Sequence, residues 1–178
     1  MGYEIAGGLG VKLARPEHDV FVLVGDGSYL MLSGELATSI QEGIKLIVVL
    51  LDNHGFGCID GLTHDCGGDN TFNQFRFRDP ATGQLAGPLL PIDFAANAAS
   101  LGARVITAQG HAGVAAALEQ AKASDRTTVV VIEIAGDVRA PGFESWWDVP
   151  IAEVSESVGV RDARQMYEEK RASERWLV

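Results

Sequence analysis

Short apolar runs that alternate with amphipathic stretches predict an α/β fold. Runs rich in valine, leucine and isoleucine, with lengths that suit buried strands, lie at 20–24, 46–51 and 127–134. Between the first two, a helical pattern begins near Ser28 or Leu30 and ends at Gly43. Its apolar side is formed by Leu32, Leu36 and Ile40. Strand, helix and strand in this order form a βαβ unit, whose two strands we expect to be parallel.

The second half of the chain continues this alternation. Asp93 is a good N-cap for a helix over 94–101 that ends at Gly102. Residues 103–107 then predict a strand and residues 112–123 an alanine-rich helix. We therefore expect a doubly wound parallel sheet with helices on both faces, as one domain over 1–178. Within it, 136–178 should form a C-terminal tail that carries a helix over 160–176.

The turn after the first strand carries a candidate ligand site. Gly25-Asp26-Gly27 places one carboxylate between two glycines, residues that are able to adopt positive φ and to let other atoms approach the backbone closely. Asn53 follows the second strand, and since parallel strands end at the same edge of a sheet, Asp26 and Asn53 should be neighbours. Carboxylate and amide oxygens suit Mg2+, which needs few protein side chains when a phosphate supplies the other oxygens. The pattern predicts a site for a metal with a diphosphate.

Charge and composition argue against two classes of partner. A net charge of -10 opposes binding to nucleic acid, whose backbone is itself negative. We expect no membrane contact, because no 18-residue apolar span and no secretory signal are present. Cys58 and Cys66 lie too far apart for a Cys-x-x-Cys metal or redox pair. They are expected to be free thiols in a loop, as in a cytoplasmic protein.

The Gly25-Asp26-Gly27 turn, the helix after it, the second strand and Asn53 together resemble the signature of thiamine diphosphate (ThDP) enzymes. The resemblance is to the domain that holds the cofactor's diphosphate through Mg2+. It implies that the Asp26 carboxylate, the Asn53 side-chain oxygen and the Gly55 main-chain carbonyl bind the metal. The residues that it implies for cofactor binding are Met1, Gly25, Asp26, Gly27, Ser28, Asn53, Gly55 and Phe56.

Residues 1–14 outline a helix with four glycines, which predicts close packing against a flat surface. Its opening Met1-Gly2-Tyr3 is similar to a segment of the acetolactate-synthase branch, whose methionine supports the bent cofactor beneath the thiazolium ring. Alternatively, Met1 is only the start residue of a frayed terminus. The resemblance also implies that the chain is the C-terminal third of a homo-oligomeric enzyme. The catalytic glutamate would then lie on a separate pyrimidine-binding domain of a neighbouring subunit, and this chain alone would be inactive.

Two segments resemble one branch of the family more specifically. LDNHGFGCIDGL at 51–62 and SWWDVPIAEVS at 145–155 are similar to the enzymes of inositol catabolism that open trihydroxycyclohexane-1,2-dione with water to 5-deoxyglucuronate. The substrate implied is thus a small cyclic diketone. An acetolactate synthase-like carboligase or decarboxylase is the alternative, disfavoured because these enzymes commonly have a second Asn, acidic residues and a Trp after the metal-binding Asn. His54 and His64 are candidates for substrate contact, or surface histidines without a role.

Two further alternatives stay open. A phosphoacceptor receiver domain is also a doubly wound fold, and Asp26 and Asp52 would be its carboxylates. Such a domain needs a lysine after a late strand, where this chain has Ala135. Trp146 and Trp147 are expected to pack either against a partner surface or back on the chain's own sheet.

Overall fold

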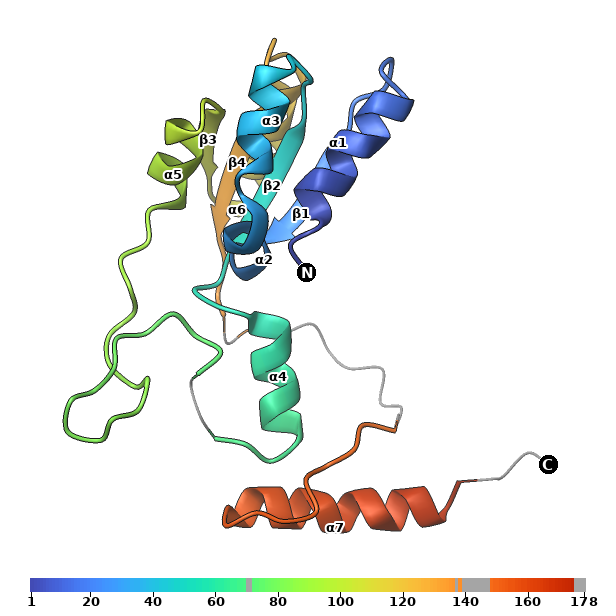
Figure 1. Cartoon of the computed structure of the whole chain (residues 1–178), viewed down its shortest axis with the longest axis vertical. Helices are drawn as coiled ribbons and strands as arrows, with labels where there is room; N and C mark the ends of the chain where they lie inside the picture. The colour runs from blue at the N-terminus through green and yellow to red at the C-terminus, as the bar shows by residue number, and fades with distance from the viewer. Residues whose placement is uncertain (70–71, 137, 139–147, 175–178) are drawn as a thin grey trace. The chain divides into compact units, whose positions relative to one another are not determined.

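The computed structural model of the chain describes residues 1–69, 72–136, 138 and 148–174. The chain divides into two compact units, one of Met1–Phe56 with Leu89–Gly136 and one of Gly57–Pro88 with Asp137–Val178. The first unit contains the sheet (Figure 1). The assignment of 1–178 to one domain stays a prediction.

The first unit is built on a parallel sheet. In the described part of the chain its strands are β1 (Phe21–Gly25), β2 (Ile47–Asp52), β3 (Arg104–Ala108) and β4 (Thr128–Glu133). They lie in the order β1-β2-β4-β3, and each neighbouring pair is parallel. The expected βαβ unit and parallel sheet are confirmed. Since β4 is next to β2, the ends of β1, β2 and β4 are neighbours, and Asp52 is in register with Glu133.

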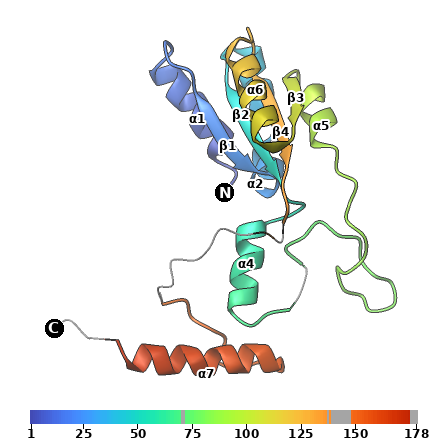
Figure 2. The ribbon, with the colours of Figure 1, turned by 180° about the vertical axis from the view of Figure 1, so that it is seen from behind.

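Helices cover both faces of this sheet, as expected for a doubly wound fold (Figures 1 and 2). The helices of the first unit are α1 (Glu4–Ala14), α2 (Asp26–Leu32), α3 (Glu35–Gln41), α5 (Phe94–Ser100) and α6 (Gly110–Lys122). Figure 1 shows α1, α3 and α5 on the near face, and Figure 2, from behind, shows α6 on the other. The carboxyl ends of the strands and the chain's N-terminus lie at the same end of the unit as α2.

The core lies between the sheet and its helices, and one edge of it is left uncovered. α6 packs its alanines on a buried cluster that includes Ile47 and Val49 of β2. Phe21 and Leu23 of β1 are in register with these two residues, so their side chains point to the same face. They lie beyond the cover of α6, and 43% of Phe21 and 66% of Leu23 are exposed. Edge strand β1 therefore presents apolar side chains to solvent.

The predicted helix after β1 differs from the observed one in two respects. It begins at Asp26 itself, before Ser28, and it is broken at 33–34 into α2 and α3. Leu36 is fully buried, but Leu32 is 39% exposed, so the expected continuous apolar side was wrong at Leu32. Because the helix is broken at Ser33-Gly34, the apolar sides of α2 and α3 do not form one continuous stripe.

The helix ends were predicted more closely. The Asp93 carboxylate accepts a hydrogen bond from Ala96 N–H at 2.8 Å and caps α5, as expected. Gly43 and Gly102 have φ values of 62° and 93°, the left-handed conformation with which a glycine ends a helix. Among the described helices none is long and apolar enough to cross a membrane.

The second unit contains α4 (Gly57–Asp65) and α7 (Val158–Ala172). α4 was missed by the sequence analysis, so Cys58, a free thiol as expected, lies on a helix and not in a loop. α7 confirms the helix expected in the tail up to Ala172, and the part of that prediction beyond residue 174 lies outside the described residues. Trp146 and Trp147 also lie outside them.

The glycines of α1 allow the close packing that the sequence predicts, and this gives a testable expectation. A Cβ built at Gly8 would collide with Val22 Cγ2 of β1, whereas Gly10 has no heavy atom within 4 Å. Gly8→Ala should therefore destabilise the protein by about 1–3 kcal/mol through overpacking. Gly10→Ala should be neutral or stabilise it by up to about 1 kcal/mol through helix propensity. Denaturant unfolding of both variants tests this, and equal stabilities would contradict the packing argument.

Candidate functional site

Asp26 is the centre of the group of residues that the sequence singled out. It is the first residue of α2, directly after β1, and it is fully buried. Its Oδ1 accepts a hydrogen bond from Gly27 N–H at 2.8 Å, and its Oδ2 accepts one from Gly55 N–H at 2.9 Å. The carboxylate thus ties the loop after β2 to the start of α2.

Asn53 and Gly55 complete this arrangement from the loop after β2. One end of the Asn53 side-chain amide lies 2.8 Å from the Gly55 carbonyl oxygen and 3.2 Å from Asp26 Oδ1. With its NH2 group turned inward, the amide donates to both oxygens. With its oxygen turned inward, three oxygen atoms face one another, an arrangement that is unfavourable unless a cation lies among them. The neighbourhood of Asp26 and Asn53 is as predicted.

The surroundings of Asp26 oppose its charged form. Burial, and then a hydrogen bond to the Asp52 carboxyl, raise the pKa of Asp26 from 3.8 to about 6, although the N–H groups of Gly55 and Gly27 act in the opposite direction. Asp52 itself is nearly buried, at the end of β2. Two carboxyl groups therefore lie together at this edge, where a bound cation would favour their ionised forms.

The two glycines beside Asp26 have different surroundings. Neither has a positive φ; Gly25 is extended, with φ of -77°, and Gly27 lies inside α2. The need for glycine at 27 is steric, because an added Cβ would lie 2.6 Å from two carbons of the Phe56 ring. At Gly25 an added Cβ would meet no heavy atom within 4 Å, so that backbone is open to approach. The close approach to the backbone that glycine permits is found at Gly27.

The remaining residues of the predicted site are less closely associated with Asp26. Ser28 is partly buried in the first turn of α2. Met1 is 65% exposed ahead of α1, and its contact with a cofactor stays a prediction. Within the described residues there is no cluster of three or more His, Cys, Asp or Glu side chains suited to a metal. The donors gathered here are of three kinds: a carboxylate, an amide and a main-chain carbonyl.

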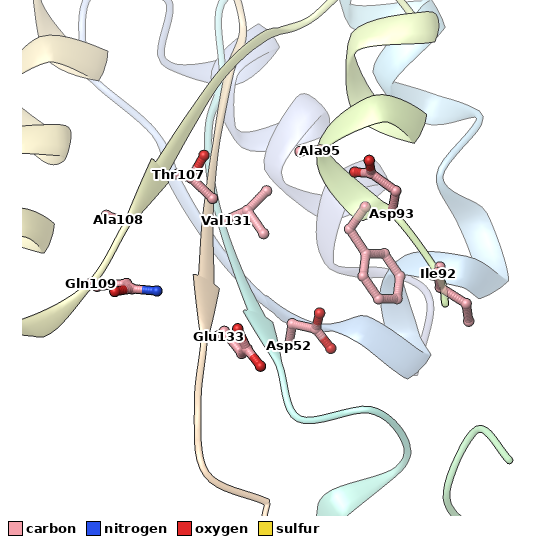
Figure 3. A pocket seen from close by; sticks show the side chains of 10 residues that line it. Asp52, Ile92, Asp93, Ala95, Thr107, Ala108, Gln109, Val131 and Glu133 are labelled. Atoms are coloured by element: carbon pink, nitrogen blue, oxygen red, sulfur yellow. The ribbon is translucent and has the colours of Figure 1, made fainter. Parts of the chain in front are cut away.

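His54 has a conformation that the sequence did not predict. Its φ is 61°, in the left-handed region that non-glycine residues seldom adopt. Its Nδ1 lies 3.4 Å from Asp52 Oδ1, and its Nε2 lies 3.5 Å from Glu133 Oε1. Asp52 and Glu133 also line a cavity of about 260 Å³ at the ends of β2, β3 and β4 (Figure 3). Nothing in the sequence indicated Glu133 as a site residue. It lies beside Asp52 because β4 is next to β2 in the sheet.

Comparison with known sequences identifies the family of this chain. Residues 1–134 match the model of the thiamine pyrophosphate enzyme, C-terminal TPP binding domain. The chain belongs to this family. Thiamine pyrophosphate is another name for thiamine diphosphate, so the match confirms the resemblance seen in the Gly25-Asp26-Gly27 turn and the cofactor expected from it. The receiver-domain alternative is not supported.

Similar curated proteins carry a more specific name. A 3D-(3,5/4)-trihydroxycyclohexane-1,2-dione hydrolase of Clostridium botulinum (strain Eklund 17B / Type B) is 48% identical over 163 residues, 92% of this chain and 25% of that protein. One of Geobacillus thermodenitrificans (strain NG80-2) is 43% identical over 163 residues, 92% of this chain and 26% of that protein. The chain thus spans about a quarter of the length of these relatives.

A solved structure supports the fold. The thiamine diphosphate-dependent 4-hydroxybenzoylformate decarboxylase of Rhodococcus jostii RHA1 superposes with a TM-score of 0.63 and 23% identity. The superposition covers 76% of this chain and 23% of the decarboxylase. At this identity the likeness concerns the fold, and it confirms the expected α/β architecture.

Proposed function

We propose that this TPP-binding domain holds the diphosphate of ThDP through Mg2+ at the edge where β1 and β2 end. The observation that carries the proposal is the convergence of three donors: the Asp26 carboxylate, the Asn53 amide and the Gly55 carbonyl. These are hard oxygen donors, and Mg2+ bound to a diphosphate needs few of them from the protein. The chemistry of these donors fits the metal.

Each residue of the site has its own proposed task. Asp26 supplies negative charge, and the N–H groups of Gly27 and Gly55 hold its carboxylate in place before a cation arrives. The open backbone at Gly25 leaves room for the diphosphate, to which Gly27 and Ser28 would donate hydrogen bonds. Phe56 closes one side of the turn by packing over Gly27. Met1 would support the rest of the cofactor.

The chain's role in catalysis is to fix the cofactor's position. When bound, ThDP supplies an electron sink for the cleavage of a bond beside a carbonyl group. We propose that the catalytic groups come from the pyrimidine-binding domain of a neighbouring subunit in a homo-oligomer. This chain contains no catalytic residue in that proposal and is inactive by itself.

For the full-length protein we propose hydrolysis of a carbon–carbon bond in trihydroxycyclohexane-1,2-dione. Support comes from relatives that carry this name and are 43–48% identical over more than nine-tenths of the chain. The bond between the two carbonyl carbons breaks, the hydroxyl of water joins one carbon to give a carboxylic acid, and a hydrogen joins the other to give an aldehyde. The ring opens to 5-deoxyglucuronate, an intermediate of myo-inositol catabolism.

The experiment that tests this function uses the full-length protein with ThDP, Mg2+ and the cyclic dione. We expect one equivalent of acid per dione consumed, recorded in a pH-stat, and aldehyde signals in proton NMR. The same protein with pyruvate should form no acetolactate. Turnover of pyruvate but not of the dione would instead establish the acetolactate synthase-like alternative.

We also propose that the protein works in the cytoplasm. This proposal is supported by Cys58 and Cys66, which are both free thiols. Reducing compartments such as the cytoplasm keep cysteines in this state.

A further inference from the structure

His54 lies between two of the proposed metal ligands, Asn53 and Gly55, in a conformation that costs free energy. Among the described residues it is the one non-glycine residue with a positive φ, at 61°. A residue with a Cβ pays about 1–2 kcal/mol to adopt this region. Other contacts must offset that cost, because otherwise a glycine would serve better at this position.

The contacts that hold His54 come from the ends of two neighbouring strands. Its N–H donates to Asp52 Oδ1 at 3.1 Å, and its ring nitrogens lie 3.4 Å from Asp52 and 3.5 Å from Glu133. Asp52 ends β2 and Glu133 ends β4, and the two are partners in the sheet register (Figure 3). The imidazole therefore spans from one strand end to the next.

This placement leaves the ring little to offer a substrate. Both of its nitrogens are already within reach of a carboxylate, and its side chain is 33% exposed. A further hydrogen bond holds the same strand ends together, from Ile134 N–H to the Asp52 carbonyl oxygen at 2.8 Å. The loop that begins after Asp52 thus starts from a rigid base.

We propose that His54 is a positioning residue for the metal site. Anchored by Asp52 and Glu133, it holds the left-handed turn that brings the Asn53 side chain and Gly55 back towards Asp26. Asp52 supports this anchor from the main chain as well, because its carboxyl accepts the hydrogen bond from His54 N–H. The inference rests on the proposed Mg2+ and diphosphate site, and it adds an anchor outside the metal's own ligands.

The test separates the imidazole from the backbone conformation. In the full-length protein, His54→Gly removes the ring and the strain together, whereas His54→Ala removes the ring and keeps the strain. Glu133→Gln leaves the ring and removes one of its charged partners. His111→Ala, at an exposed position on α6, is the control. The readout is the dissociation constant of Mn2+ with ThDP, measured by electron paramagnetic resonance without substrate.

We expect both His54 variants to bind Mn2+ about 10–100-fold more weakly, as is usual when a group that orients a metal ligand is lost. Glu133→Gln should fall between them and the wild-type protein, and His111→Ala should bind as the wild type does. The melting temperature of His54→Gly in EDTA should stay near that of the wild type.

Two results would overturn the inference. Tight Mn2+ binding by His54→Gly, within about twofold of the wild type, would show that only the backbone conformation matters. If the wild-type protein itself did not bind Mn2+ with ThDP, the result would contradict the proposed metal site and, with it, the role of His54.

Discussion

Replacing Asp26 by alanine is expected to abolish the Mg2+-dependent binding of ThDP, with a loss of affinity of more than about a hundredfold. Loss of a group that merely orients a metal ligand already costs about 10–100-fold, and Asp26 is proposed to be a ligand itself. The substitution also removes the acceptor for Gly27 N–H and Gly55 N–H, so the loop after β2 loses its tie to α2. Calorimetric titration of ThDP in Mg2+, repeated in EDTA, measures the effect.

Two further variants define the cause of that loss. Asp26→Asn keeps the side chain's volume and one acceptor oxygen but removes its charge. If Asp26→Asn binds ThDP as weakly as Asp26→Ala does, the loss of affinity is due to the charge. Asp125→Ala is the control, because Asp125 is an exposed carboxylate whose side chain is 86% accessible. Metal-dependent binding by Asp26→Ala within about tenfold of the wild type would contradict the site.

Adding one methyl group at Gly27 is expected to weaken ThDP binding by about tenfold or more and to destabilise the protein by about 1–3 kcal/mol. The new Cβ would lie 2.6 Å from the Phe56 ring, so the ring must move. Phe56 directly follows Gly55, and its displacement would shift the Gly55 carbonyl away from Asp26. Gly34→Ala is the control, since an added Cβ there meets no heavy atom within 4 Å.

A double-mutant cycle identifies the ring as the cause. In Gly27→Ala combined with Phe56→Leu, the methyl group no longer meets the aromatic ring. The two substitutions should therefore cost less together than the sum of their separate effects, as residues in contact do. Strict additivity, in both ThDP affinity and the free energy of unfolding, would show that Gly27 is needed for another reason.

The sequence predicted the neighbourhood of Asp26 and Asn53 because that prediction needs only parallel strands. A helix that connects two neighbouring buried strands is the usual crossover between parallel strands, so their carboxyl ends lie at the same edge of the sheet. The anchor of His54 could not be predicted in this way. It depends on β4 lying next to β2, and strand order is set by packing of the whole sheet and not by any local pattern.

Other differences have local causes. Glycine is able to adopt positive φ, but neither glycine beside Asp26 does so, and in the loop after β2 it is His54 that adopts it, held by carboxylates from two strands. α4 was missed because Gly57–Asp65 contains two glycines and several polar residues, so its helical pattern is weak. The break between α2 and α3 lies at Ser33-Gly34, a dipeptide that favours a turn. The helix prediction considered only the spacing of apolar residues and therefore missed it.

The uncovered edge of the sheet has a consequence for handling the chain in solution. Among the described strands β1 pairs with β2 alone, and Phe21 and Leu23 are exposed on this edge strand. Such an edge is a template on which a strand of another molecule can add, which leads to aggregation as concentration rises. Self-association of the isolated chain is therefore poor evidence for a native oligomer. A charged residue at position 23 would act as a gatekeeper against this growth without touching the cofactor site.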